Sequence, residues 1–397
     1  MPLASQKIAV SSTRAFHRRD ATFVLFVLFG FSPLSSGDAE DMLGPRFPGN
    51  IGWSHLIAGR PFIPILPFGF GQSNPTYLLT AADGKQVVLR KKPPGKLVSK
   101  TAHKVEREYK IIRALGDTDV PVPRAYCLCE DSSVIGTPFY IMEFLDGRHF
   151  TDPAMPGVNA EERTALWKNA VQTLAKFHSV IPKAVGLETF GKPTGFFDRQ
   201  VATFTTISKA QAAVVDADTK EPVGELPHFD DMVNFFSQKA TQPRDRGTLV
   251  HGDYKIDNMI FHKTEPRVIG ILDWEMATVG HPLSDFCNLT SPYTMDGADS
   301  QLSQFKPGVV PGLPGRQECI RWYAETSGYE TGSDVAWGDA FFAFRGSVIM
   351  QGIAARFAGR QASSARAEDY AKRAKPFAEG AWERVQAVQK ASLKGKL

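Results

Sequence analysis

The sequence predicts an α+β fold of two lobes, a small β-rich lobe with one helix and a larger, mainly helical lobe. Short extended segments dominate residues 61–146, and long helical patterns dominate residues 147–392. The 397 residues can form two to three units at roughly 100–200 residues each, and 43% hydrophobic residues suit a globular chain.

The small lobe is expected to contain a β-hairpin that follows a glycine-rich segment. YLLTA (77–81) and QVVLRKK (86–92) flank an Ala-Asp-Gly turn, and FGFGQSNPTYLL (68–79) overlaps the first arm. Glycines let backbone N–H groups approach phosphate oxygens, although a glycine-rich turn without a ligand is the alternative. No helix follows, and the third glycine of a dinucleotide-binding fingerprint is absent. The nucleotide-binding candidates in this segment are Gly69, Gly71, Ser73 and Asn74.

The helix expected at 102–115 carries an acid on its apolar face. At about 100° per residue, Glu108 lies within the arc formed by four apolar positions, which are Val105, Tyr109, Ile112 and Leu115. A buried acid requires a partner. Arg90 on the preceding strand is one candidate, and Lys91 is the alternative because a one-residue register error exchanges faces. We expect this pair to align nucleotide phosphates, and we add Glu143 to the nucleotide-binding candidates.

Helical patterns and two irregular stretches follow. Asn159 and Glu162 form a cap-like start to a helix whose apolar residues repeat at helical spacing, namely Leu166, Ala170, Leu174 and Phe177. Further long helices are expected between residues 337 and 389. The segments 190–200 and 296–316 are interpreted as irregular loops, either functional or plain surface loops.

The strongest chemical signal is VHGDYKIDNMIF (250–261) followed by VIGILDWE (268–275). Each segment is an apolar, strand-like run that meets a polar cluster. Phosphoryl transfer needs a carboxylate to accept a hydroxyl proton, a cation near the moving phosphate and oxygen ligands for magnesium. The catalytic candidates are Asp253, Lys255 and Asn258, and the magnesium candidates are Asn258 and Asp273.

Other polar residues near these segments receive structural interpretations or stay open. We expect His251 to brace the loop by hydrogen bonding and His178 to be a packed structural histidine. Asp285 is expected to hold backbone amides at a helix start. The role of Glu275, in metal or substrate binding, stays open.

Charge and cysteine content exclude several classes of protein. The net charge is only +4, from 46 basic and 42 acidic residues, so we expect no nucleic-acid partner. The four cysteines form no CxxC pair, which argues against a zinc site and a dense disulfide framework. The basic segment 90–104 holds six Lys or Arg residues and no acid, and it is either a solvated loop or a contact for an anionic substrate.

These motifs resemble a known family. HGDYKIDN with ILDWE resembles the aminoglycoside phosphotransferase and choline kinase-like superfamily, a relative of the protein kinases. FGQSNPTYLL, AHKVEREY and DWEMATVGHPLSDF resemble the kinase-like domain found ahead of acyl-CoA dehydrogenase in some proteins, over about residues 65–390. The resemblance implies a bilobal protein-kinase-like fold that uses ATP and Mg²⁺.

Residue by residue, the resemblance implies roles for the motif positions. Asp253 would be the catalytic base, Asn258 and Asp273 the metal ligands, and Glu108 the helix acid. Arg90 stands where many relatives have lysine, which keeps the charge and changes the pairing geometry.

The function expected from this resemblance is ATP-dependent O-phosphorylation of a small molecule. The expected acceptor is a 4-hydroxy acid or its CoA ester, because the basic segment and Arg199 suit a carboxylate or CoA phosphates. The alternatives are a kinase for an amino alcohol, sugar or aminoglycoside, and a nucleotide-binding module without catalysis. A separate acyl-CoA dehydrogenase is an expected partner, since we expect any paired elimination step to come from another protein.

The two ends of the chain carry targeting-like features. Basic residues precede an apolar run at 21–31, which is shorter than the roughly 17–25 residues that a membrane-spanning helix needs. We interpret residues 1–60 as a presequence or an atypical extension, because secretion does not suit an ATP-dependent kinase. Gly395-Lys396-Leu397 approaches a peroxisomal address. We expect a cytoplasmic or peroxisomal location, with the mitochondrion as an alternative, and no firm membrane association.

Overall fold

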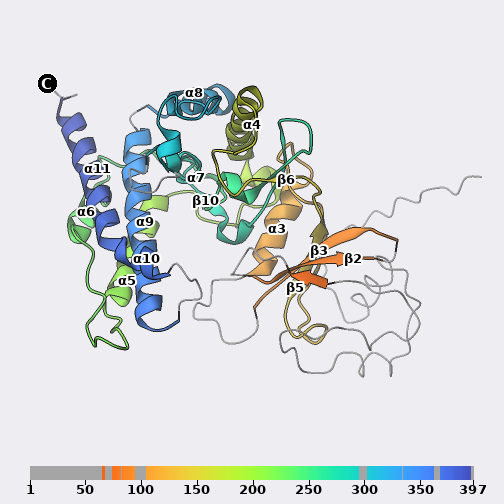
Figure 1. Ribbon diagram of the computed structural model, residues 1–397, viewed down its shortest axis with the longest axis horizontal. Helices are drawn as coiled ribbons and strands as arrows, with labels where there is room; N and C mark the ends of the chain where they lie inside the picture. The colour runs from red at the N-terminus through yellow and green to blue at the C-terminus, as the bar shows by residue number, and fades with distance from the viewer. Residues whose placement is uncertain are drawn as a thin grey trace, which may run out of the picture. The chain divides into compact units, whose positions relative to one another are not determined.

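The computed structural model describes residues 65–67, 74–81, 83–93, 104–294, 302–332, 334–361 and 367–394 (Figure 1). The chain divides into two compact units. The first combines the described residues up to Gly116 with Pro123–Leu145, and the second combines Asp117–Val122 with the described residues from Asp146 onward. The expectations for residues 1–60, Gly69, Gly71, Ser73 and residues 395–397 lie outside the described residues.

The first unit is built on a five-stranded antiparallel sheet. Its strands lie in the order β1-β2-β3-β5-β4. They span Ile65–Pro67 (β1), Thr76–Thr80 (β2), Gln86–Lys91 (β3), Ala125–Cys129 (β4) and Phe139–Glu143 (β5). The predicted hairpin is confirmed, because β2 and β3 pair antiparallel with Thr80 opposite Gln86. One face of the sheet packs around a small apolar cluster that includes Leu79, Phe139 and Ile141.

Helix α3 (Val105–Leu115) contacts β4 and β5 in this unit. Glu108 is buried, as its place in the helical period predicted. The predicted apolar face needs one correction, because Ile111 is buried whereas Tyr109 is only half-buried. Tyr109 instead contacts the Tyr140 ring with the two ring centroids 6.2 Å apart, so its position is at the edge of the buried face.

The second unit is mainly helical. Its helices span Ala160–Ser179 (α4), Phe196–Ala212 (α5), Phe229–Phe236 (α6), Leu283–Leu289 (α7), Arg316–Ser327 (α8), Asp334–Ala358 (α9), Ala367–Lys372 (α10) and Ala374–Lys394 (α11). The Asn159 side chain accepts a hydrogen bond from the backbone N–H of Glu162, which confirms the predicted cap of α4. The expectation of an irregular loop over 190–200 is wrong in its second half. Residues from Phe196 onward are helical because Phe196, Phe197 and Phe204 bury one face of α5.

Short strands position the loops of the second unit. Strands β6 (Arg148–His149), β8 (Met259–Phe261) and β9 (Val268–Ile271) form one antiparallel sheet. Strand β7 (Thr248–Val250) pairs with β10 (Thr278–Gly280) in a second sheet. Single 3₁₀ turns span Pro182–Val185 (η1), Ile256–Asn258 (η2), Trp274–Met276 (η3), Ser291–Tyr293 (η4) and Leu302–Phe305 (η5).

The main core of the second unit lies among α5, α6, α9 and α11. Figure 1 shows α5 and α6, from the middle of the chain, beside the C-terminal helices α9 and α11. Phe236, Phe341 and Phe344 meet at its centre, with Phe236 contacting both other rings. In the part of the chain that the structure describes, no helix is both long enough and apolar enough to cross a membrane.

Candidate active site

The loop that follows β7 is held by one buried carboxylate. Asp285 in α7 is fully buried, and its two oxygens accept hydrogen bonds from the backbone N–H groups of His251 at 2.7 Å and Gly252 at 2.8 Å. Burial alone would raise the pKa of Asp285, but its interactions with His178 and His251 outweigh burial and lower it. The expectation that Asp285 holds amides at a helix start is therefore corrected, since these amides belong to the loop.

A second buried contact orients the Asp285 carboxylate. His178 in α4 places Nε2 3.2 Å from Asp285 Oδ2, and its Nδ1 lies 2.7 Å from the hydroxyl of Tyr323 in α8. All three side chains are buried. The prediction of a packed structural histidine at position 178 is confirmed, because both ring nitrogens have partners inside the protein.

His251 joins the loop to the end of β9. Its Nε2 lies 2.8 Å from the carbonyl oxygen of Leu272, and its Nδ1 accepts a hydrogen bond from the backbone N–H of Asp253. The backbone N–H of Leu272 in turn donates to the carbonyl oxygen of Asn258 at 2.8 Å. These contacts give His251 the bracing position that the sequence predicted.

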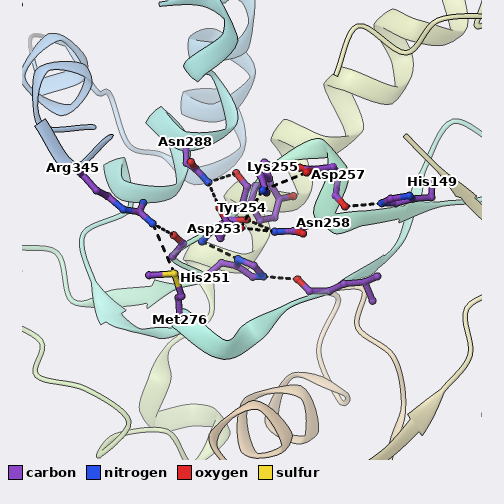
Figure 2. A network of polar contacts seen from close by, with 12 residues as sticks. His149, His251, Asp253, Tyr254, Lys255, Asp257, Asn258, Met276, Asn288 and Arg345 are labelled. Atoms are coloured by element: carbon purple, nitrogen blue, oxygen red, sulfur yellow. Dashed lines mark hydrogen bonds and ion pairs between the residues drawn. The ribbon is translucent and has the colours of Figure 1, made fainter. Parts of the chain in front are cut away.

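Asp253 lies at the centre of a polar network (Figure 2). Its Oδ2 accepts a hydrogen bond from Asn258 Nδ2 at 2.9 Å and lies 3.3 Å from the ammonium of Lys255. Its Oδ1 accepts from Asn288 Nδ2 at 3.3 Å. Burial alone would lower the pKa of Lys255, but the carboxylates of Asp253 and Asp257 raise it. The loop therefore brings the three predicted catalytic residues together around one carboxylate.

Asn258 and Asp273 are neighbours because the strands beside them are paired. Met259 of β8 lies opposite Ile271 of β9 in an antiparallel pair. Asn258, which precedes β8, therefore lies beside the residues that follow β9. The Asn258 amide nitrogen donates to both the carbonyl and the carboxylate of Asp253. Among the described residues, the Asn258 side-chain oxygen makes no hydrogen bond, and an amide oxygen can ligate a metal ion. Asp273 adopts a left-handed backbone with φ of 64°, an uncommon conformation that concentrates at functional sites.

The donor chemistry of Asn258 and Asp273 fits Mg²⁺. Among the described residues, no group of three or more His, Cys, Asp or Glu side chains could hold a metal ion. Magnesium usually takes one or two protein oxygens and fills its remaining positions with substrate phosphates and water. A pair of protein oxygens is therefore compatible with a metal that arrives with the nucleotide. Glu275 follows in η3, where it is half-buried, and its role stays open.

A glycine and an arginine complete the loop. Gly252 has φ of 87°, and a Cβ there would lie 2.8 Å from Met276 Cβ, so only glycine fits this contact. Arg345 in α9 donates from Nη2 to the carbonyl oxygen of Gly252 at 2.8 Å. Tyr254 is fully buried and donates to the carbonyl oxygen of Ala170 in α4, which fixes the other side of the loop.

Two residues of this network were missed from the sequence. Asn288 lies one helical turn after Asp285, so the polar positions 285 and 288 on a short apolar helix were a usable signal. Arg345 is a cation within the otherwise apolar run FFAFRGSVIM, which was a second signal. Conversely, Arg199 donates to the carbonyl oxygens of Thr194 and Lys192, so its guanidinium contacts its own loop.

The first unit contains a second buried charge network. Arg90 Nε of β3 lies 2.7 Å from Glu108 Oε2 of α3, and both side chains are buried. Tyr140 donates to Glu108 Oε2 at 3.0 Å, and the amide of Asn74 donates to Glu108 Oε1. The structure therefore pairs Glu108 with Arg90. Whether this pair aligns nucleotide phosphates stays a prediction.

Neighbouring candidates in the first unit have other contacts. The ammonium of Lys91 lies 5.5 Å from the centre of the Tyr77 ring, and burial lowers the Lys91 pKa. Glu143 at the end of β5 accepts from the backbone N–H of Arg124 at 3.0 Å. Within the basic segment 90–104, residues 94–103 lie outside the described residues.

Comparison with known proteins identifies the family. The model of the phosphotransferase enzyme family matches residues 64–318. The chain belongs to this family. A crystal structure of a "putative aminoglycoside phosphotransferase" from Ralstonia eutropha is 36% identical and has a TM-score of 0.71, with 84% of this chain and 95% of that chain covered. The predicted bilobal kinase-like fold and the predicted class of enzyme, a phosphotransferase with an alcohol group as acceptor, are confirmed.

Curated relatives carry acyl-CoA dehydrogenase names. The chain is 38% identical over 321 residues to mouse "Acyl-CoA dehydrogenase family member 10" and 36% identical over 323 residues to chicken "Acyl-CoA dehydrogenase family member 11". Each match covers 80% of this chain but only 29% and 40% of the two relatives. The family resemblance stated from the sequence motifs is confirmed, and this chain corresponds to less than half the length of these relatives.

We expect Asp285→Asn to destabilise the second unit by about 3–5 kcal/mol, because it breaks a buried charge network that holds two backbone amides. The lowered Asp285 pKa contributes stability above the ordinary aspartate pKa, and this stability is lost as pH falls through the folded-state value. The variant should therefore lose less stability than the wild type on acidification. Denaturant unfolding at several pH values measures both effects.

Asp257→Asn, at a half-exposed position, is the control and should change stability by less than about 1 kcal/mol. Equal losses in the two variants would contradict the assignment.

We expect Arg90→Gln and Lys91→Gln to differ strongly. The first leaves Glu108 buried without its cation, at a cost of about 3–5 kcal/mol, whereas the second removes a cation–π contact worth about 0.5–1 kcal/mol. Hydrogen exchange at the amides of β2 and β3 measures opening of the first unit separately from the second. Similar protection in both variants would show that the ion pair does not hold this sheet together.

Proposed function

We propose that the chain is an ATP- and Mg²⁺-dependent O-phosphotransferase that acts on a hydroxyacyl small molecule. The observation that carries this proposal is the set of contacts around Asp253, in which an amide, an ammonium and a second amide all point at one carboxylate. A carboxylate held in this way beside two oxygen ligands suits hydroxyl activation for phosphoryl transfer. The family membership reported above supports the same class of reaction.

In this proposal Asp253 orients the acceptor hydroxyl and accepts its proton as the oxygen attacks the terminal phosphorus of ATP. The bond from that phosphorus to the bridging oxygen of the second phosphate breaks, and ADP leaves. Lys255 lies close enough to Asp253 to balance negative charge as the phosphoryl group moves. Asn258 and Asp273 would hold Mg²⁺, which when bound neutralises charge on the phosphate oxygens. Asn288 and the Asp285 network keep the carboxylate and the loop backbone in a fixed position, so little reorganisation is needed during the reaction.

The proposed role of the first unit is to hold the nucleotide phosphates. Arg90 has a planar guanidinium held by Glu108, and its permanent positive charge would attract phosphate oxygens. Asn74, which lies within the segment 68–79, contacts the same carboxylate. These residues support a phosphate-binding role. ATP and GTP carry the same three phosphates, so the assay includes both nucleotides.

The hydroxyacyl acceptor is supported by the names of the curated relatives. Because these relatives are acyl-CoA dehydrogenase family members, we propose that the acceptor belongs to acyl-CoA metabolism and that a dehydrogenase is a partner in the same route. An aminoglycoside is the second candidate, favoured by the description of the Ralstonia eutropha relative. A polycationic aminoglycoside would need acidic side chains around the acceptor site.

We expect Asp253→Asn to lower kcat for phosphoryl transfer by about a thousandfold, within the range for loss of a general base. The measurement is transfer of the labelled terminal phosphate from ATP or GTP to a panel of hydroxy acids, their CoA esters, amino alcohols, sugars and aminoglycosides. Asp230→Asn, at an exposed position in the first turn of α6 and outside the loop, is the matched control and should change kcat by less than about threefold. Wild-type turnover in Asp253→Asn would refute the assigned base. Nucleotide binding without transfer to any acceptor would instead support a module without catalysis.

A further inference from the structure

A pocket of about 310 Å³ lies between α5 and α9 in the second unit. Its walls are mostly apolar and include Phe196, Phe204 and Phe341. Gly252, in the loop between β7 and η2 that we call the catalytic loop (residues 251–255), and Met276 of η3 also line it. The pocket therefore reaches the residue next to the proposed base Asp253.

Apolar side chains are exposed to solvent around this pocket. Ile207 is 39% exposed, Met276 is 52% exposed and Ile349 is 47% exposed, and all three line the pocket. Exposed apolar side chains that gather at one concave site mark a binding surface more often than isolated ones do. A molecule that binds at this surface would therefore place an apolar part against these three side chains.

The charges at the pocket have one sign. Among the described residues that line it, the charged side chains are Arg345 and Arg356, and none is acidic. Such a wall repels a polycationic acceptor and suits a ligand with negative charge or carbonyl oxygens. The two arginines are eleven residues apart on α9, which places them on the same face and roughly 16 Å apart along the helix axis.

Arg345 is the arginine at the catalytic end of the pocket. It is half-buried, and its Nη2 donates to the carbonyl oxygen of Gly252. Within the described part of the chain, its Nε and Nη1 donors make no hydrogen bond, so a ligand oxygen can take them. Gly252 directly precedes Asp253, so Arg345 contacts the loop next to the proposed base.

We propose that this pocket is the acyl site of the enzyme. The unbranched alkyl chain of the acceptor lies between α5 and α9, and Arg345 binds the oxygen atoms of its carboxyl end. The inference rests on the proposed function for the position of the acceptor hydroxyl at Asp253. It assigns recognition of the alkyl chain to the apolar side chains of α5 and α9, and recognition of the carboxyl end to Arg345. An apolar alkyl chain is then required for tight binding.

Binding of straight-chain saturated acids tests the alkyl site without any phosphoryl transfer, because these acids have no hydroxyl. In calorimetry with the full chain, each added methylene should tighten binding about fourfold until the pocket is filled. Ile207→Asp should weaken binding of the longest acid at least tenfold, since it places a charge against the chain. Ala210→Asp, an exposed position on the same helix outside the pocket lining, should leave binding unchanged.

The end-group assignment is tested by comparing an acid with its methyl ester and its CoA thioester. Wild-type protein should bind the acid, the thioester or both at least tenfold more tightly than the methyl ester, and Arg345→Gln should bring the ratios close to one. A purely structural role of Arg345 would weaken all three ligands by the same factor and would overturn this assignment. Dependence on Arg345 for the acid alone identifies a free carboxylate as the bound group. Dependence for the thioester identifies the CoA phosphates, because the methyl ester carries an acyl carbonyl as well.

The outcomes separate this inference from the proposed function. Affinity that does not depend on chain length, or equal losses in Ile207→Asp and Ala210→Asp, would overturn the acyl site even if hydroxy acids are phosphorylated. Chain-length-dependent binding with no phosphorylation of any hydroxy acid or its CoA ester would leave the acyl site standing and would refute the proposed reaction.

Discussion

The arrangement of the catalytic loop depends on one buried carboxylate. Asp285 accepts hydrogen bonds from two consecutive backbone N–H groups, and this contact fixes the direction in which the following residue, Asp253, leaves the strand. Removing a charged acceptor from buried donors lowers stability more than removing an exposed ion pair does, because no water can reach the buried donors to replace the lost acceptor. His178 and Tyr323 lie far from Asp253 in the contact network and still determine its position through Asp285.

In the first unit too, a buried carboxylate holds groups from several segments, but here it holds a side-chain cation. Glu108 is buried, pairs with Arg90 and accepts hydrogen bonds from Tyr140 and Asn74, so its carboxylate joins side chains from separate segments. In the second unit the carboxylate fixes backbone, whereas in the first it fixes a guanidinium. A buried acid with several donors can do either, because each oxygen accepts more than one hydrogen bond and the charge makes those bonds strong.

Sequence patterns predicted the local features and missed the contacts between distant segments. The hairpin, the α4 cap and the buried position of Glu108 each depend on residues a few positions apart, and periodicity or turn chemistry reveals such features. Asn288 and Arg345 reach the loop from helices 35 and 93 residues away, and no local pattern encodes that contact. The helical start at Phe196 was missed for a related reason, because the burial of three phenylalanines in the core outweighs the glycine and proline that precede them.

The double use of the Asn258 amide has a consequence for the chemical ageing of the protein. Its nitrogen donates to the carbonyl and the carboxylate of Asp253, while its oxygen makes no hydrogen bond within the part of the chain that the structure describes. Deamidation would replace that nitrogen with oxygen and turn a donor into a second negative acceptor beside the first carboxylate. The resulting repulsion would push apart two groups that the fold holds together, although the side chain would keep nearly the same size and shape. Replacing one nitrogen with oxygen at this position would therefore turn an attraction between the two side chains into a repulsion.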